Sequence, residues 1–161
     1  MLKEMKENDF IVSKTDLKGL ITYTNKIFID MAGYTEEELL GKPHNIIRHP
    51  DMPKAVFSYL WDTIKKKEEV FAFVINKTKD GSAYWVYANV TASLDEKGNI
   101  IGYYSVRRKP NPKALEIIIP LYKKMLEVER NSGIDASFDF LTNILQEKGV
   151  GYDELIIDIQ E

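Results

Sequence analysis

The stretch between residues 71 and 108 constrains the fold most, because its side chains alternate with the period of two that β-strands require. Asp80-Gly81 and Glu96-Lys97-Gly98-Asn99 are tight-turn sequences that divide this stretch. It therefore predicts three consecutive antiparallel strands, over Phe71–Asn76, Ala83–Ser93 and Ile100–Arg108. In the middle strand, one face carries Trp85, Tyr87, Asn89 and Thr91, and the other Tyr84, Val86, Ala88 and Val90.

Two more strands are expected upstream, over Phe10–Val12 and Leu20–Tyr23, joined by a hairpin turn at Asp16–Gly19. Helices fill the region between these strands and residue 71. The pattern predicts an α+β fold with a five-stranded antiparallel sheet and helices covering one face.

Three helix starts are marked by capping residues. Asn25 is expected to cap a short helix that Gly33 ends, and Thr35 to cap a second with Glu38 in a capping box. Asp51 is expected to cap a longer helix that reaches about Lys67. That helix carries an apolar stripe at helical spacing, namely Val56, Phe57, Leu60, Trp61 and Ile64.

The segment Gly41–Pro53 places both histidines of the chain, one arginine, one aspartate and three prolines directly before that helix. Proline lacks an N–H and restricts the residue before it, so this segment is a stiff loop and not a helix. Such a polar loop beside an apolar helix favours a binding site, and the alternative is a surface turn with a helix cap.

The run Arg48-His49-Pro50-Asp51-Met52-Pro53, followed by Phe57 and Trp61, resembles the PAS domains of bacterial aerotaxis receptors. The resemblance extends to the run Gly33–Gly41, to Asn76-Lys77 and to Gly102–Arg107, and so covers roughly residues 10–109. It implies a PAS fold and a cavity that holds FAD.

The resemblance also implies a set of flavin-binding residues. The matching positions are Asn25, Arg48, His49, Asp51, Phe57, Trp61 and Asn76. Residue chemistry adds Phe28 and Trp85, whose aromatic rings could form walls of the cavity. It also adds Asn89, because asparagine is disfavoured in strands and a buried amide needs a hydrogen-bond partner. One departure is Val70-Phe71, where these receptors tend to carry tryptophan.

Two other functions remain open at this point. A haem sensor would need an axial histidine, for which His44 and His49 are the candidates. A ligand-free interaction module would need neither. An enzyme is not expected, because the chain has no Gly-rich phosphate loop and no cluster of metal ligands, and the absence of cysteine excludes a cysteine–flavin adduct.

Composition fits a cytoplasmic sensor, and the resemblance implies an association with a membrane-bound receptor. The net charge of −3 gives no electrostatic reason to bind nucleic acid, and no segment is apolar enough for a membrane span. The charged N-terminus does not resemble a signal peptide.

Three regions are expected: an N-terminal segment over residues 1–9, the PAS sensor domain over 10–109, and a helical extension over 110–161. The extension predicts helices over Pro112–Glu129, with a kink or break at Pro120, and over Ala136–Glu147. It has no room for an output domain, so the expected output partner is another chain. The resemblance to the aerotaxis receptors implies that this partner is a separate chemotaxis transducer. The apolar faces of its helices need burial, so we also expect a homodimer, formed through these helices or through the N-terminal segment.

Overall fold

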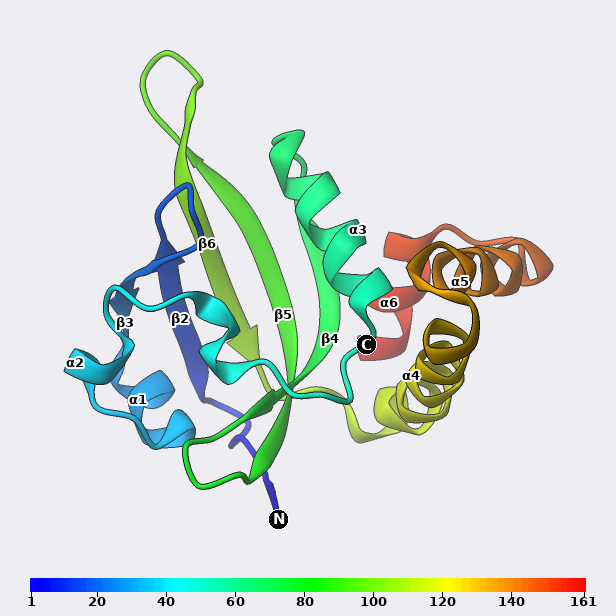
Figure 1. The fold of residues 1–161 in the computed structure, drawn as a ribbon, viewed down its shortest axis with the longest axis horizontal. Helices are drawn as coiled ribbons and strands as arrows, with labels where there is room; N and C mark the ends of the chain where they lie inside the picture. The colour runs from blue at the N-terminus through cyan, green and yellow to red at the C-terminus, as the bar shows by residue number, and fades with distance from the viewer.

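The computed structural model describes all 161 residues, and a curved six-stranded sheet lies at its centre (Figure 1). Strand β5 lies between β4 and β6, and β2 and β3 continue the sheet beyond β6 in antiparallel pairs. The bounds are β2 Phe10–Thr15, β3 Ile21–Thr24, β4 Val70–Lys77, β5 Ala83–Leu94 and β6 Ile100–Arg108. The three-strand meander is therefore confirmed, together with the upstream hairpin.

The sixth strand, β1 (Leu2–Lys3), corrects the expectation of five antiparallel strands. It pairs in parallel with β5 at Ala83 and Tyr84, so the sheet is mixed. Two residues are too few to show a period of two, which is why the sequence pattern does not reveal this strand.

Helices α1 (Lys26–Ala32), α2 (Glu36–Leu39) and α3 (Lys54–Lys65) and the 3-10 helix η1 (His44–Ile47) cover the inner face of the sheet (Figure 1). The Asn25 side chain accepts a hydrogen bond from the Phe28 N–H, and Thr35 and Glu38 form a capping box. Both predicted caps are confirmed.

The expected start of α3 at Asp51 is wrong. The helix begins at Lys54 with Pro53 at its N-cap position, and Asp51 has an exposed side chain before it. Proline favours an extended conformation in the residue that precedes it, so Pro53 prevents a helix from starting at Asp51.

Helices α4 (Pro112–Ser132), α5 (Ile134–Lys148) and α6 (Tyr152–Gln160) pack beside β4 and on the outer face of the sheet (Figure 1). The Tyr122 hydroxyl of α4 donates to the Phe73 carbonyl at 2.6 Å, and the Tyr152 hydroxyl of α6 donates to the Phe71 carbonyl at 3.0 Å. Since β4 pairs only with β5, these bonds cover an edge strand.

A kink or a break is expected at Pro120, and the helix bounds exclude the break, because α4 continues through the proline. Proline removes the N–H that would bond the Glu116 carbonyl, but both residues are exposed. Water can therefore satisfy that carbonyl, which explains why the helix tolerates the proline.

Candidate functional site

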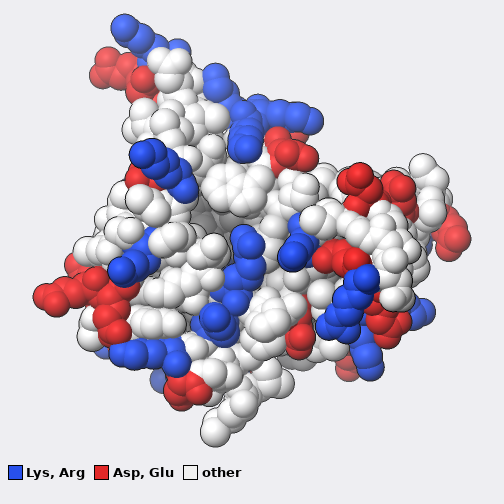
Figure 2. Space-filling model, viewed as in Figure 1, with Lys and Arg blue, Asp and Glu red and all other residues white.

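A cavity of about 220 Å³ lies between the inner face of the sheet and helix α3. Figure 2 shows a hollow near the centre of this face, with basic side chains beside it. The α3 wall consists of Phe57, Leu60, Trp61 and Ile64, and the sheet floor includes Val74, Asn76, Ala88, Val90, Tyr103, Ser105 and Arg107. The loop before α3 adds Pro43, His44, Asn45, Ile47 and Arg48, and the β2 side adds Ser13, Thr15, Lys18 and Gly19.

Aromatic rings form one end of the cavity. Trp61 meets Tyr103 edge to face, with ring centroids 5.2 Å apart. The β2–β3 turn approaches Trp61 at Gly19, which has φ +82° and lies where an added Cβ would be 3.7 Å from the indole. A glycine is required there by its backbone conformation, and it brings the turn against the cavity wall.

Arg107, Ser13 and His44 form a buried polar chain at the other side. Arg107 Nη2 donates to Ser13 Oγ at 2.7 Å, and Ser13 Oγ lies 3.0 Å from His44 Nε2. Because arginine only donates, Ser13 accepts from it and its own hydroxyl proton is free to donate to His44. His44 then carries its proton on Nδ1.

Burial determines the protonation states of the two titratable groups in this hydrogen-bonded series, His44 and Arg107. Burial, together with the smaller effects of the nearby Arg107 and Arg48 guanidinium groups, lowers the pKa of His44 to about 3, so His44 is neutral at physiological pH. Burial lowers the pKa of Arg107 to about 10, which leaves it charged. No carboxylate forms an ion pair with Arg107, whose guanidinium instead lies 4.6 Å from the centroid of the Phe28 ring.

Several buried polar atoms around the cavity lack a hydrogen-bond partner. They include Nε of Arg107, Nδ2 of Asn76 and the hydroxyl of Tyr84. Burial raises the pKa of Tyr84, against the opposite effects of the Arg107 charge and of the Asn76 side chain, which faces Tyr84 across strands β4 and β5. Unpaired buried donors cost free energy, so this cavity suits a ligand that brings hydrogen-bond acceptors or negative charge.

Arg48 supplies a second cation at the cavity. Its guanidinium lies 4.1 Å from the centroid of the Phe57 ring, and partial burial lowers its pKa. A backbone bridge between Arg48 and Asn76 ties the loop to strand β4. Arg48 has no carboxylate partner either, so its donors are available to an anionic group.

Four of the residues predicted for the site line the cavity together: Arg48, Phe57, Trp61 and Asn76. Phe28 lies beside them, fully buried under Arg107.

The other five predicted residues lie outside the cavity lining. The Asn25 side chain bonds three backbone groups, on Phe10, Val12 and Phe28. His49 Nδ1 accepts from the Asp51 N–H at 3.0 Å, so these two residues bond each other within the loop.

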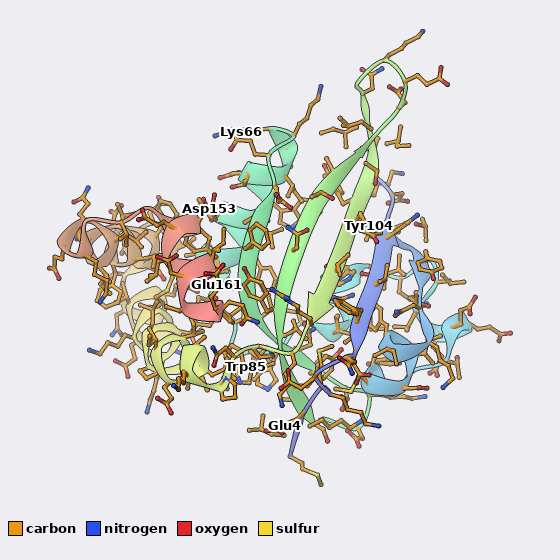
Figure 3. The ribbon with its side chains drawn as sticks, turned by 180° about the vertical axis from the view of Figure 1, so that it is seen from behind. Glu4, Lys66, Trp85, Tyr104, Asp153 and Glu161 are labelled. Atoms are coloured by element: carbon orange, nitrogen blue, oxygen red, sulfur yellow. The ribbon has the colours of Figure 1, made fainter.

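Trp85 and Asn89 belong to the face of β5 that points away from the cavity. Figure 3 shows Trp85 on the outer side of the sheet, and its ring centroid lies 6.0 Å from that of Tyr122 in α4. The Asn89 amide donates to Glu69 Oε1 at 2.8 Å. The structure therefore accounts for both residues without a ligand.

Ser13 and Arg107 are site residues that the sequence-based set misses, and His44 appears there only as a candidate haem ligand. A signal for Arg107 does exist, because the period of two places it on the same face of β6 as Tyr103 and Ser105, which line the cavity. An arginine on a buried face needs an explanation, and a ligand supplies one.

A haem would need a histidine ligand in the cavity. Of the two histidines, only His44 lines the cavity, and its Nε2 is at hydrogen-bond distance from Ser13. His49 is outside the lining, with Nδ1 bonded within the loop.

A family profile described as "PAS fold" matches residues 21–107. The chain is 44% identical over 115 residues to the aerotaxis receptor of Escherichia coli, which covers 71% of this chain and 22% of the receptor. It is 27% identical over 97 residues to the nitrogen fixation regulatory protein of Klebsiella pneumoniae, covering 60% of this chain and 20% of that protein. The chain thus spans about a fifth of the length of these relatives.

Solved structures share the fold. The dark structure of the blue-light photoreceptor Aureochrome1 LOV superposes with a TM-score of 0.59 at 25% identity, covering 74% of this chain and 86% of that one. A light-oxygen-voltage domain described with a flavin analogue gives a TM-score of 0.56 at 27% identity, covering 76% of this chain and 86% of that one. No helix here combines the length and the apolar character needed to cross a bilayer.

Proposed function

Because the chain belongs to the PAS family and its sensor region is of the aerotaxis-receptor type, we propose that residues 10–109 bind FAD and sense redox state or oxygen. We further propose that the signal passes to a separate chemotaxis transducer. The observation that carries the proposal is the pairing of an aromatic wall with two cations that have no carboxylate partner.

The residues around the cavity fit a flavin. Phe57 and Trp61 offer apolar contact to a planar ring, while Asn76 and Arg107 offer unpaired donors to its polar edge. Arg48 is available to a phosphate group through its guanidinium. Flavin supplies reversible oxidation and reduction, which gives the domain its input.

The cavity volume supports a ligand that is only partly enclosed. Pockets that enclose drug-sized ligands usually measure roughly 300–1,000 Å³, and this cavity measures about 220 Å³. A ring system inside, with the remainder of the dinucleotide extending through the opening, agrees with that size.

Purification tests the cofactor directly. The protein is expected to show the two absorption bands of oxidised flavin, and heating is expected to release FAD rather than FMN, as chromatography would identify. A Soret band would instead indicate haem, and a colourless protein that takes up no flavin would favour the ligand-free module.

A transducer is proposed as the partner because the relative is an aerotaxis receptor, of which this chain matches 22%. Pull-down of a chemotaxis transducer from cells under oxidising and reducing conditions tests that step, and equal recovery would contradict it. Homodimerisation stays a prediction, which light scattering of the purified chain tests. The faces expected to drive it are partly buried within one chain, through Ile118, Tyr122 and Leu141.

A further inference from the structure

Helix α3 lacks a cap of its own. Pro53 at its N-cap position contributes no side-chain hydrogen bond, and its first turn contains no acidic residue. In contrast, α1, α2 and α4 are capped by the side chains of Asn25, Thr35 and Asn111, which directly precede them. Helices α5 and α6 also lack a capping side chain at their N-cap glycines, but each has an acidic residue in its first turn, Asp135 in α5 and Asp153 in α6. Helix α3, which borders the cavity, has neither feature, so its first turn needs a partner from elsewhere in the fold.

That help comes from α4. The Glu129 carboxylate accepts from the Lys54 N–H at 2.9 Å and from the Ala55 N–H at 3.1 Å, across 75 and 74 residues of sequence. Ser137 of α5, which is fully buried, lies 2.9 Å from Glu129 Oε2 and 3.2 Å from the Met125 carbonyl. A negative charge at a helix N-terminus is stabilising, so Glu129 links the α4–α5 pair to α3.

The same helix contacts the extension along its other side. Tyr59 of α3 stacks with Phe138 of α5 at a centroid distance of 6.1 Å and meets Tyr152 of α6 at 4.5 Å. Phe57 and Trp61 of α3 line the cavity. A shift of α3 on ligand binding therefore changes contacts with all three C-terminal helices.

We infer that Glu129 is a positioning residue of the cavity, and that through it the α4–α5 pair responds to the ligand state by way of α3. This inference rests on the proposed function, because it takes flavin as the ligand. Coupling between two sites is reciprocal. If flavin strengthens the contact between Glu129 and α3, then removal of that contact must weaken flavin binding.

Glu129→Gln tests the coupling, because it keeps the shape of the side chain and removes its charge. Glu127→Gln is the matched control, since Glu127 lies on the same helix, is exposed and makes no side-chain hydrogen bond. Amide hydrogen exchange by NMR at Lys54 and Ala55 reports the cap, with and without bound FAD. Ser137→Ala, which leaves Glu129 charged, is a second variant expected to act in the same direction.

In flavin-free Glu129→Gln we expect exchange at both amides to become about tenfold faster than in Glu127→Gln. We expect FAD affinity to fall about fivefold or more, within the usual range of coupling. FAD should slow exchange at Lys54, Ala55 and Ser137 in the control and do so less in Glu129→Gln. A purely structural cap would lower thermal stability and speed exchange in the flavin-free protein, but it would leave FAD affinity unchanged.

Unchanged FAD affinity in Glu129→Gln, or equal exchange with and without FAD in the control, would overturn the inference. If wild type and Glu127→Gln both bind no flavin, the proposed function fails. The inference is then judged on the flavin-free protein, where equal exchange in Glu129→Gln and Glu127→Gln overturns it and faster exchange retains the link from α4 to α3.

Discussion

Arg107 and Ser13 are joined across neighbouring strands by a hydrogen bond of 2.7 Å from the guanidinium Nη2 to the serine hydroxyl. Strands β6 and β2 pair so that Arg107 faces Ile11 and Ser13 faces Ser105. The bond is buried, and its guanidinium has no carboxylate partner. A cation in this position destabilises the empty domain and favours a ligand that carries acceptors or negative charge.

Arg107→Met is expected to separate binding from folding. The flavin-free variant should unfold within about 1 kcal/mol of wild type, because removing an unpaired buried charge offsets the lost hydrogen bond. Its FAD affinity should fall at least about tenfold. Urea unfolding and flavin titration measure the two quantities. Arg108→Met is the control, since Arg108 is exposed on the opposite face of β6, and a similar loss of affinity there would contradict the assignment.

His44 predicts a pH dependence of stability. Its pKa is about 3 in the folded chain, from an ordinary value of 6.5, so the unfolded chain takes up the proton first as pH falls. Stability is therefore lost between about pH 6.5 and 3. From pH 7 to 5, wild type should lose about 2 kcal/mol more than His44→Gln, which does not titrate. Parallel losses in urea unfolding of the two proteins would contradict this.

The sequence predicts most of the fold because its strongest signals are local. The period-two alternation of side chains predicts strands β4 to β6. The capping residues Asn25 and Thr35 are recognised from residues within a few positions of them. The start of α3 is missed because two rules compete at one place, and the restriction that Pro53 imposes outweighs the capping propensity of Asp51. The cap that α3 does receive, from Glu129, is 75 residues away and leaves no local signal.

The site is predicted less completely for a related reason. Trp85 and Asn89 share a face of β5 that alternation identifies, but alternation does not say which face points inward. Only the packing of α3 and α4 on opposite sides of the sheet decides that. Trp85 and Asn89 are expected in the cavity and lie outside it, whereas Arg107 is not expected there and lies on the inward face. Arginine usually occupies the surface, so its residue type does not predict this position.

Arg48 and His49 are adjacent, yet the structure assigns them different environments. Arg48 lines the cavity against Phe57, and His49 does not line it. Arg48→Ala should reduce FAD affinity about tenfold or more through the loss of charge-assisted bonds. His49→Ala should change it less than about twofold. Fluorescence titration of FAD measures both, and equal losses would mean that the loop acts through its folding.

The amide that responds to flavin reduction should be Asn76 and not Asn89. Asn76 lies in the cavity with an unpaired Nδ2, whereas Asn89 bonds Glu69 on the outer face. Reduction changes which flavin atoms donate and accept, and only an amide in contact can reorient in response. Asn76→Leu should shift the flavin absorption bands and its reduction potential, and Asn89→Leu should leave both unchanged. Spectroelectrochemistry distinguishes these outcomes, and the reverse result would place the switch elsewhere.

The C-terminal helices are expected to keep strand β4 from pairing with other chains. Tyr122 and Tyr152 occupy the Phe73 and Phe71 carbonyl groups of this edge strand. A chain that ends at Pro110 exposes that edge, so it should self-associate as its concentration rises, while the full chain does not do so through β4. Light scattering during size-exclusion chromatography measures this association. The shortened chain with Phe71→Lys should stay monomeric, because an edge lysine opposes strand pairing. If the shortened chain is monomeric without that substitution, the tyrosine contacts serve stability and do not protect the edge.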